Sequence, residues 1–276
     1  GNRILYSFGG TMADPRMEKT IEATGLDSSN KWRFSAGSSG RNGEEDAIRI
    51  GQLFDVKRGL ATGANSFFIL TEEKAREYDI PQVFLRSILP SPRFLHEDVI
   101  TADKAGLPNT ERRLFLLDCT EDPEVVKRRH PGLWHYLELG RAKGVADAYL
   151  CGNRKVWYFQ ERRQPALFLA TYMGRSENTN RCPLHFYLNL SKAVVSNVFL
   201  NLYPKPFLGK LLEDDENRLG ELLRSLQAVT CTQVVEEGRS YGGGLHKLEP
   251  REMGNIALQP LPEWLVVEVE EQLALI

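Results

Sequence analysis

Apolar and polar positions repeat along the chain with periods that predict both strands and helices. Residues 48–59, IRIGQLFDVKRG, alternate apolar and polar side chains, which is the two-residue period of a half-buried strand. SFFIL at 66–70 predicts a second strand, and the two glycines between these segments are typical of a hairpin loop. Residues 4–10 also read as a strand. β-Branched and aromatic residues predict further strands over 113–119, 155–160, 165–173, 184–190 and 192–204.

Helix signals stand between these predicted strands. Thr71 precedes two acidic residues and is a good N-cap, and Pro81 is suited to opening a short helix that Pro90 and Pro92 end. Residues 123–144 are helical in part, with a break at Pro131. Apolar residues three and four apart over 216–237 predict an amphipathic helix, and Pro262 opens a terminal one. The pattern predicts an α+β fold: twisted, mostly antiparallel β-sheet hairpins with inserted helices and a C-terminal helical part.

Composition indicates the class of protein but not its function. The chain has 276 residues, of which 42% are hydrophobic and 26% charged, as in ordinary soluble globular proteins. A net charge of −2 argues weakly against nucleic acid, but binding depends on where the charges lie. Four scattered cysteines without a CxxC pair favour neither a zinc ribbon nor a disulfide framework. With no membrane-length apolar run, we expect a cytoplasmic protein.

The stretch VKRGLATGANS, residues 56–66, is the first candidate for chemistry. Glycines at 59 and 63 can turn backbone N–H groups toward an anion, and the neighbouring side chains add charge and short polar groups. The second glycine is not followed by Lys-Ser/Thr, so a nucleotide-triphosphate loop is not supported. The alternative is a hairpin loop with a solvated Lys-Arg pair. The candidate residues are Lys57, Arg58, Thr62, Gly63 and Asn65.

Three further segments carry basic residues near aromatics, glycines or prolines. In LCGNRKVWYFQERR, Arg154, Lys155 and Arg162 could contact phosphates while the aromatics stack on bases, unless the segment is a strand with inward aromatics. SYGGGLHKLEPRE permits close backbone approach, or is a flexible loop before a helix; its candidates are Tyr241, Gly243, His246, Lys247 and Arg251. Arg86, beside a proline-rich turn, is either a surface arginine or a DNA contact.

Patterns that would indicate catalysis are missing from this sequence. The five histidines have no metal-ligand spacing, and neither a Gly-x-Ser-x-Gly elbow nor a dinucleotide-binding glycine pattern occurs. We therefore predict no catalytic and no metal-binding residue in this chain.

Taken in order, the segments resemble the C-terminal target-recognition (specificity) domain of N6-adenine DNA methyltransferases of restriction–modification systems. VKRGLATGANSFFIL, IPQVFLRSILPSPR, LCGNRKVWYFQERR, KAVVSNVFLNLYPK and RSYGGGLHKLEPREMGNI carry the resemblance, over roughly residues 48–262. SFGGT near the start resembles the last strand of the preceding methyltransferase domain.

The resemblance implies the end of that domain plus a linker over 1–47, and a duplex-DNA recognition domain over 48–276. A chain that opens in mid-strand is expected to be a piece of something longer.

The sequence departs from such enzymes in two motifs. They hold a flipped adenine with Asn/Asp-Pro-Pro-Tyr/Phe and bind S-adenosylmethionine with a glycine-containing loop, and neither motif is present here. The resemblance therefore implies the specificity half, with no cofactor in this chain, S-adenosylmethionine in a missing catalytic domain, and that domain or subunit as a second partner beside DNA. Three other interpretations remain open: a protein-interaction scaffold of a defence complex, an enzyme using Glu161 or His246, or a remnant that binds nothing.

Overall fold

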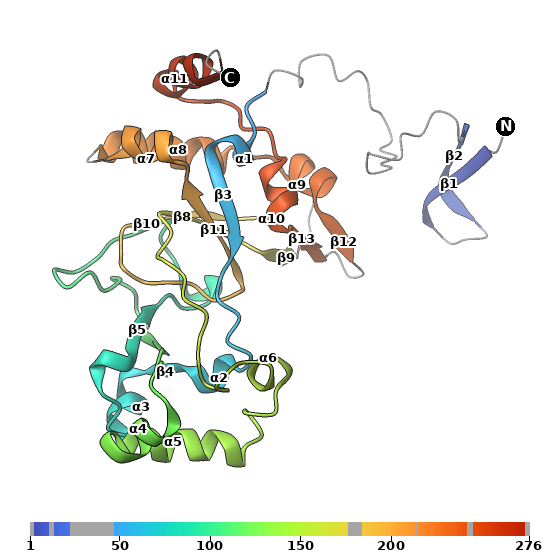
Figure 1. Ribbon diagram of the computed structural model, residues 1–276. Coiled ribbons are helices and arrows are strands. Elements are labelled where there is room, and N and C mark those ends of the chain that lie inside the picture. Colours follow the sequence, from blue (N-terminus) through green and yellow to red (C-terminus); the bar gives the residue numbers. More distant parts are fainter. Residues whose placement is uncertain are drawn as a thin grey trace. The chain divides into compact units, whose positions relative to one another are not determined.

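The computed structural model describes residues 3–10, 14–22, 47–175, 184–213, 215–241 and 245–273, and the chain divides into two compact units, Gly1–Asp46 and Ala47–Ile276 (Figure 1). In the first unit, β1 (Arg3–Gly10) pairs antiparallel with β2 (Pro15–Glu22), with Arg3 opposite Glu22. The strand predicted near the N-terminus is confirmed. The sequence pattern does not predict β2, because its charged residues obscure Met17 and Ile21; residues 23–46 lie outside the described part.

A five-stranded sheet forms the centre of the second unit, in the order β3-β11-β8-β10-β6. All neighbouring pairs are antiparallel except β10 with β6. The three inner strands β11, β8 and β10 are almost wholly buried, whereas β3 stands at an edge and brings Lys57 and Arg58 opposite Asn201 and Leu200. The strands are β3 (Phe54–Arg58), β6 (Val99–Ile100), β8 (Phe168–Thr171), β10 (Phe186–Asn189) and β11 (Phe199–Pro204).

Two three-stranded antiparallel sheets accompany the central one, in the orders β4-β7-β5 and β12-β13-β9. The first lies in the lower part of Figure 1 together with α2 to α6, and the second lies beside α9 and α10. Their strands are β4 (Ile69–Thr71), β5 (Leu85–Ile88), β7 (Leu114–Leu117), β9 (Met173–Arg175), β12 (Arg239–Tyr241) and β13 (Leu245–Lys247).

Helices of the second unit fall into two groups in space (Figure 1). The first group surrounds the β4-β7-β5 sheet and comprises α2 (Asn65–Phe68), α3 (Glu72–Glu77), α4 (Pro123–Arg129), α5 (Pro131–Ala142) and α6 (Tyr149–Gly152), with 3-10 turns η2 (Gln82–Phe84) and η3 (Pro92–Phe94). The second group comprises α1 (Ile50–Leu53), α7 (Pro206–Leu212), α8 (Glu216–Gln227), α9 (Cys231–Glu237), α10 (Pro250–Gly254) and α11 (Glu263–Leu273). The predicted α+β class with mostly antiparallel sheets and a helical C-terminal part is confirmed.

Apolar burial explains why the elements hold together. One core cluster joins Phe54 and Phe168 of the central sheet to Leu222 and Leu226 on the apolar face of α8. A second cluster fills the β4-β7-β5 region and includes Phe68, Tyr136 and Trp157. A third lies around Leu169, Tyr187 and Phe199. Each fully buried side chain of this size stabilises the fold by about 1.5–3 kcal/mol relative to exposure.

Several predicted elements are confirmed where the signal is local. The Thr71 hydroxyl accepts a hydrogen bond from the Lys74 amide at 3.3 Å and caps α3, as predicted. Pro131 separates α4 from α5, and η2 follows Pro81. The amphipathic segment 216–237 is two helices rather than one, because Thr230 caps a new helix at Cys231. Strands form within 113–119, 165–173 and 184–190, and the terminal helix follows Pro262.

Other predictions are wrong, and tertiary contacts explain why. Residues 48–59 begin as helix α1 before β3, and SFFIL is split between α2 and β4. No hairpin joins them, since β3 pairs with β11 while β4 pairs with β7. The short helix predicted between Pro81 and Pro90 is wrong beyond η2, because residues 85–88 form strand β5, which pairs with β7. Residues 155–160 form no strand but a turn, whereas the strand predicted over 192–204 is confirmed as the shorter β11.

Candidate nucleic-acid interface

The glycine loop after β3 is fastened to the central sheet by its own backbone. The amides of Gly59 and Leu60 donate to the carbonyls of Phe199 and Val195 at 3.0 and 2.8 Å. A Cβ on Gly59 would stand 2.1 Å from the Ser196 carbonyl oxygen, so this glycine is required for close packing. The expectation that its amide faces an anion is therefore wrong, because that donor is already bonded within the protein.

Polar side chains farther along the same loop are also engaged internally. Thr62 is 1% exposed; its hydroxyl accepts from the Ala64 amide at 3.1 Å and donates to the Asn65 Oδ1 at 2.5 Å. Gly63 has φ +84°, a conformation that favours glycine. Asn65 itself is exposed at the start of α2. Thr62 and Gly63 thus shape the loop, and Asn65, like Gly63, is exposed to solvent.

The glycine loop and the segment that contains Cys151 and Arg154, which are remote in sequence, lie against each other. The Arg154 Nη2 donates to the Ala61 carbonyl at 2.8 Å, and the Cys151 thiol lies 3.7 Å from the Thr62 carbonyl oxygen. A Cβ on Gly63 would approach the Cys151 Sγ to 2.8 Å. Arg154 therefore fastens α6 to the glycine loop, and its guanidinium is 5.9 Å from the Phe68 ring centroid.

Burial decides what the aromatic part of this segment can do. Trp157 is 8% and Tyr158 1% exposed, both within the second core cluster, and the Tyr158 hydroxyl donates to the Glu121 carbonyl at 2.5 Å. The expectation that these rings stack on bases is therefore wrong. Lys155 and Arg162 remain exposed, with the Arg162 Nη2 lying 3.5 Å from the Thr120 hydroxyl.

Arg86 is partly buried rather than a free surface arginine. Its Nη2 donates to the Arg163 carbonyl, and its Nη1 lies 3.9 Å from the Asp118 carboxylate. Burial lowers the pKa of Arg86, while Asp118 raises it in partial compensation. This arginine is held mainly by groups within the protein.

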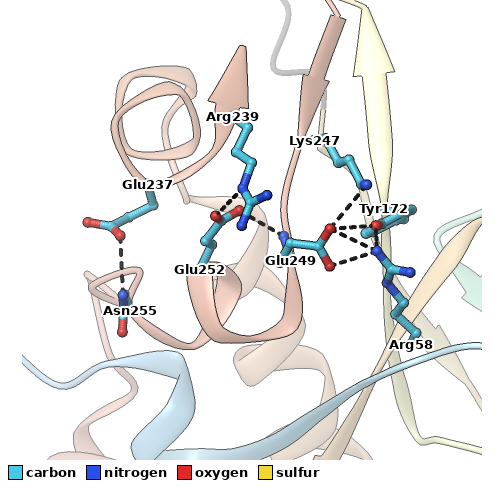
Figure 2. A network of polar contacts seen from close by, with 8 residues as sticks. All are labelled: Arg58, Tyr172, Glu237, Arg239, Lys247, Glu249, Glu252 and Asn255. Atoms are coloured by element: carbon cyan, nitrogen blue, oxygen red, sulfur yellow. Dashed lines mark hydrogen bonds and ion pairs between the residues drawn. The ribbon is translucent and has the colours of Figure 1, made fainter. Parts of the chain in front are cut away.

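One carboxylate gathers three donors from different elements (Figure 2). The Arg58 Nη2 donates to both oxygens of Glu249, at 2.8 and 2.7 Å, and the Lys247 Nζ lies 3.1 Å from Oε1. The Tyr172 hydroxyl, which the Arg58 Nη2 also contacts, donates to the same Oε1 at 2.9 Å. The network joins the edge strand β3 to β13 and to the turn before α10.

Both cations also lie over one aromatic ring. The Arg58 guanidinium carbon is 4.5 Å and the Lys247 Nζ 5.1 Å from the centroid of Tyr172. Such cation–π contacts add to the attraction of the carboxylate. The fold therefore brings together Arg58 and Lys247, two predicted DNA-binding residues that lie 189 positions apart in the sequence. Sequence reasoning missed Tyr172 and Glu249, although Glu249 follows Lys247 with the two-residue spacing of a strand face.

A second ion pair supports the turn that carries Glu249. Glu252 is 4% exposed; its Oε2 accepts from the Glu249 amide at 2.9 Å, and its Oε1 accepts from the Arg239 Nε at 2.9 Å. Asn255 donates to Glu237 at 3.4 Å on the neighbouring side, as Figure 2 shows. The position of the Glu249 backbone is thereby defined by side chains of α9, β12 and α10.

The remaining predicted residues occupy several places. Lys57 is exposed on β3, and His246 is half-buried on β13. Arg251 is exposed on α10, where with Arg49 it borders an open cavity of about 380 Å³. Tyr241 belongs to β12, with its side chain outside the described part, and Gly243 lies outside the described residues altogether.

Neither a metal-binding cluster nor a membrane-spanning helix occurs among the described residues. Within that part of the chain, no group of three or more His, Cys, Asp or Glu is arranged to hold a metal ion. Likewise, none of the helices in the described ranges has both the length and the apolarity needed to cross a membrane.

Comparison with known proteins gives the family. The family model described as Type II methyltransferase M.Eco57I, C-terminal domain, matches residues 41–274. The chain belongs to this family. The match contains the whole Glu249 network, the glycine loop and α6, and it confirms the predicted resemblance to the C-terminal domain of a restriction–modification methyltransferase.

Relatives of this M.Eco57I C-terminal domain are longer than the chain. The Type II methyltransferase M.AccI of Acinetobacter calcoaceticus is 23% identical over 246 residues, covering 86% of this chain and 41% of that protein. The Type II methyltransferase M.XamI of Xanthomonas campestris pv. amaranthicola is 27% identical over 216 residues, covering 78% and 36%. The chain thus spans about two fifths of the length of these relatives.

A solved structure shows weaker similarity. The Type IIL restriction–modification enzyme MmeI, in complex with DNA, matches with a TM-score of 0.41 and 16% identity, over 76% of this chain and 26% of that one. Similarity at this level carries no conclusion about the chain.

Proposed function

We propose that the second unit binds duplex DNA sequence-specifically, as the target-recognition part of an N6-adenine-specific DNA methyltransferase of a restriction–modification system. The observation that carries the proposal is the match of residues 41–274 to the C-terminal domain of a Type II methyltransferase. We assign residues 48–276 to DNA recognition, and residues 1–47 to the end of a methyltransferase domain plus a linker. The partners are then double-stranded DNA and a catalytic methyltransferase domain or subunit.

Exposure divides the predicted basic residues into two groups. Lys57, Lys155, Arg162 and Arg251 are exposed, so they can reach phosphates without a change in the fold. Arg86 and Arg154 are held by backbone carbonyls, and Arg58 and Lys247 are held by Glu249. We therefore propose that the exposed group supplies most of the salt-dependent affinity, while Asn65 is suited to a base edge because its amide can both donate and accept.

Catalysis belongs to another part of the enzyme in this proposal. The chain contains no Pro-Pro pair, and hence no Asn/Asp-Pro-Pro-Tyr/Phe motif to hold a flipped adenine. We propose that S-adenosylmethionine binds the catalytic domain and that this chain alone transfers no methyl group. Titration calorimetry with S-adenosylmethionine tests this assignment, since measurable binding by the chain would contradict it.

A salt-resolved DNA titration tests the central proposal. Fluorescence anisotropy with a random-sequence duplex, repeated over several salt concentrations, gives the slope of log K against log salt. We expect the slope to fall by about 0.9 for each phosphate contact removed, so Lys155→Ala and Arg162→Ala should each flatten it. Lys210→Ala, which removes an exposed lysine on α7, is the matched control and should leave the slope unchanged.

Sequence specificity needs a separate measurement. Selection from a random duplex pool, followed by competition between the enriched sequence and the starting pool, gives the specificity ratio. A chain that binds no duplex at low salt would refute DNA recognition. Equal affinity for every duplex would leave binding intact but refute the assignment as a specificity domain.

A further inference from the structure

We propose that Glu249 and Tyr172 are positioning residues that hold the Arg58 guanidinium so that its outer edge receives one oxyanion of the DNA backbone. This inference rests on the proposed function and deepens it. It names a phosphate-binding site and assigns two residues, neither of them basic, to its construction.

The first observation is that only one edge of Arg58 is engaged. Its Nη2 makes every contact with Glu249 and Tyr172. Within the described part of the chain, no hydrogen bond is assigned to its Nε or Nη1, and Figure 2 shows the second terminal nitrogen pointing away from Glu249. The Arg58 side chain is 44% exposed, against 22% for Glu249 and 23% for Lys247. The solvent-facing donor of the network is therefore the outer edge of Arg58.

Tertiary contacts remove the flexibility that normally weakens an exposed arginine. The carboxylate fixes one terminal nitrogen, and the Tyr172 ring, 4.5 Å from the guanidinium carbon, supports its flat face. Tyr172 is 5% exposed and belongs to the first core cluster, while the Glu249 turn is held by the buried Glu252. An arginine that is already ordered loses less conformational entropy when a ligand binds.

Charge and shape point to a phosphate as the ligand. Arg58 and Lys247 are two cations around one carboxylate, so the cluster keeps a net positive charge. A planar guanidinium edge matches the paired oxygens of a phosphodiester and forms charge-assisted hydrogen bonds with it. Because β3 is an edge strand, none of the other strands that the structure describes pairs with β3 on its outer side, next to Arg58.

Glu249→Gln distinguishes positioning from simple charge. If Glu249 only neutralised the cations, its removal would tighten DNA binding and steepen the salt slope. Positioning predicts the opposite: an affinity about tenfold lower, as for loss of one charge-assisted hydrogen bond, and a slope flatter by about 0.9. Glu72→Gln, which removes an equal charge from the Arg76 pair on α3, is the matched control and should not weaken binding.

A double-mutant cycle assigns the effect to Arg58. In an Arg58→Gln background, Glu249→Gln should cause no further loss, because the group that it positions is gone. Tyr172→Phe keeps the ring but removes the hydroxyl that donates to Glu249, so it should weaken binding in the same direction by a smaller factor. Thermal unfolding shows whether each variant is folded. If Glu249→Gln does not fold, the DNA affinity of Tyr172→Phe tests the positioning role in its place.

Outcomes against the inference are separable from failure of the proposed function. If the wild-type chain binds duplex and Glu249→Gln binds equally or more tightly, the positioning role is overturned while DNA recognition stands. An equal loss in the presence and absence of Arg58 also overturns it. If neither the wild-type chain nor any variant binds duplex, both are overturned.

Discussion

Gly59→Ala is expected to damage the junction between β3 and the central sheet. The added Cβ would stand 2.1 Å from the oxygen and 2.6 Å from the carbon of the Ser196 carbonyl, and 2.8 Å from the Val195 oxygen. All three are backbone atoms, so no flexible side chain can move aside. The two chain segments must separate by more than an ångström to reach ordinary contact distance.

The magnitude follows from what this separation breaks. Overpacking of this kind costs about 1–3 kcal/mol. The hydrogen bonds from the Gly59 amide to Phe199 and from the Leu60 amide to Val195 lie on the same seam, and each contributes about 1 kcal/mol. Together these give a loss of about 3–5 kcal/mol in the free energy of unfolding. That is a large share of the roughly 5–15 kcal/mol by which a typical domain is stable.

Urea unfolding followed by far-ultraviolet circular dichroism measures this loss. Gly209→Ala is the matched control, because a Cβ on Gly209 in α7 meets nothing within 4 Å. That substitution should raise stability by about 0.5–1 kcal/mol through helix propensity. A loss below about 1 kcal/mol for Gly59→Ala, with the control behaving as expected, would refute the close approach as a structural requirement.

Three further predictions concern buried polar and thiol groups. The side-chain amide of Asn189, which is 3% exposed, donates to the carbonyls of Ala166 and Ala193 at 3.2 and 3.1 Å. Asn189→Ala should therefore lower the free energy of unfolding by about 2–3 kcal/mol, measured by urea unfolding, whereas the control Asn109→Ala at an exposed site should leave it nearly unchanged. Burial raises the pKa of the Cys119 thiol to about 11, so the folded chain keeps that proton where the unfolded chain loses it, and stability should fall as pH rises from about 8.5 toward 11. Iodoacetamide labelling in a Cys182→Ser background, read by mass spectrometry, should modify the partly exposed Cys231 well before Cys119; equal rates would contradict the burial of Cys119.

Predictions held where neighbouring residues carry the decisive interactions. The Thr71 cap acts on the amide of Lys74, three positions on, and the apolar face of α8 repeats every three to four residues. Pro131 separates α4 from α5 through its own ring and missing amide. Each of these can be read within one or two helical turns of sequence, which is why the α+β class and most helix positions could be predicted.

Predictions failed where the deciding partner is remote in sequence. SFFIL has the composition of a strand, yet Phe67 and Phe68 belong to a short helix because their rings pack against Tyr136 and Trp157. The sequence leaves two interpretations of the aromatics after Lys155 open, a platform for bases and inward rings of a strand, whereas in the structure Trp157 and Tyr158 complete the core around β4 and β7. Composition alone cannot separate a ring that stacks on a base from one that fills a core.

Sequence by itself determined the class of fold, helices such as α3 and α5, and the family resemblance, because propensity, capping and motif order are properties of neighbouring residues. Tertiary structure alone decided which basic side chains remain exposed. Arg58 and Glu249 are 191 residues apart, and β3 meets β11 across 143 residues at Arg58 and Asn201. Ion pairing depends on distance in space, and folding brings these groups together through burial of apolar surface elsewhere in the chain.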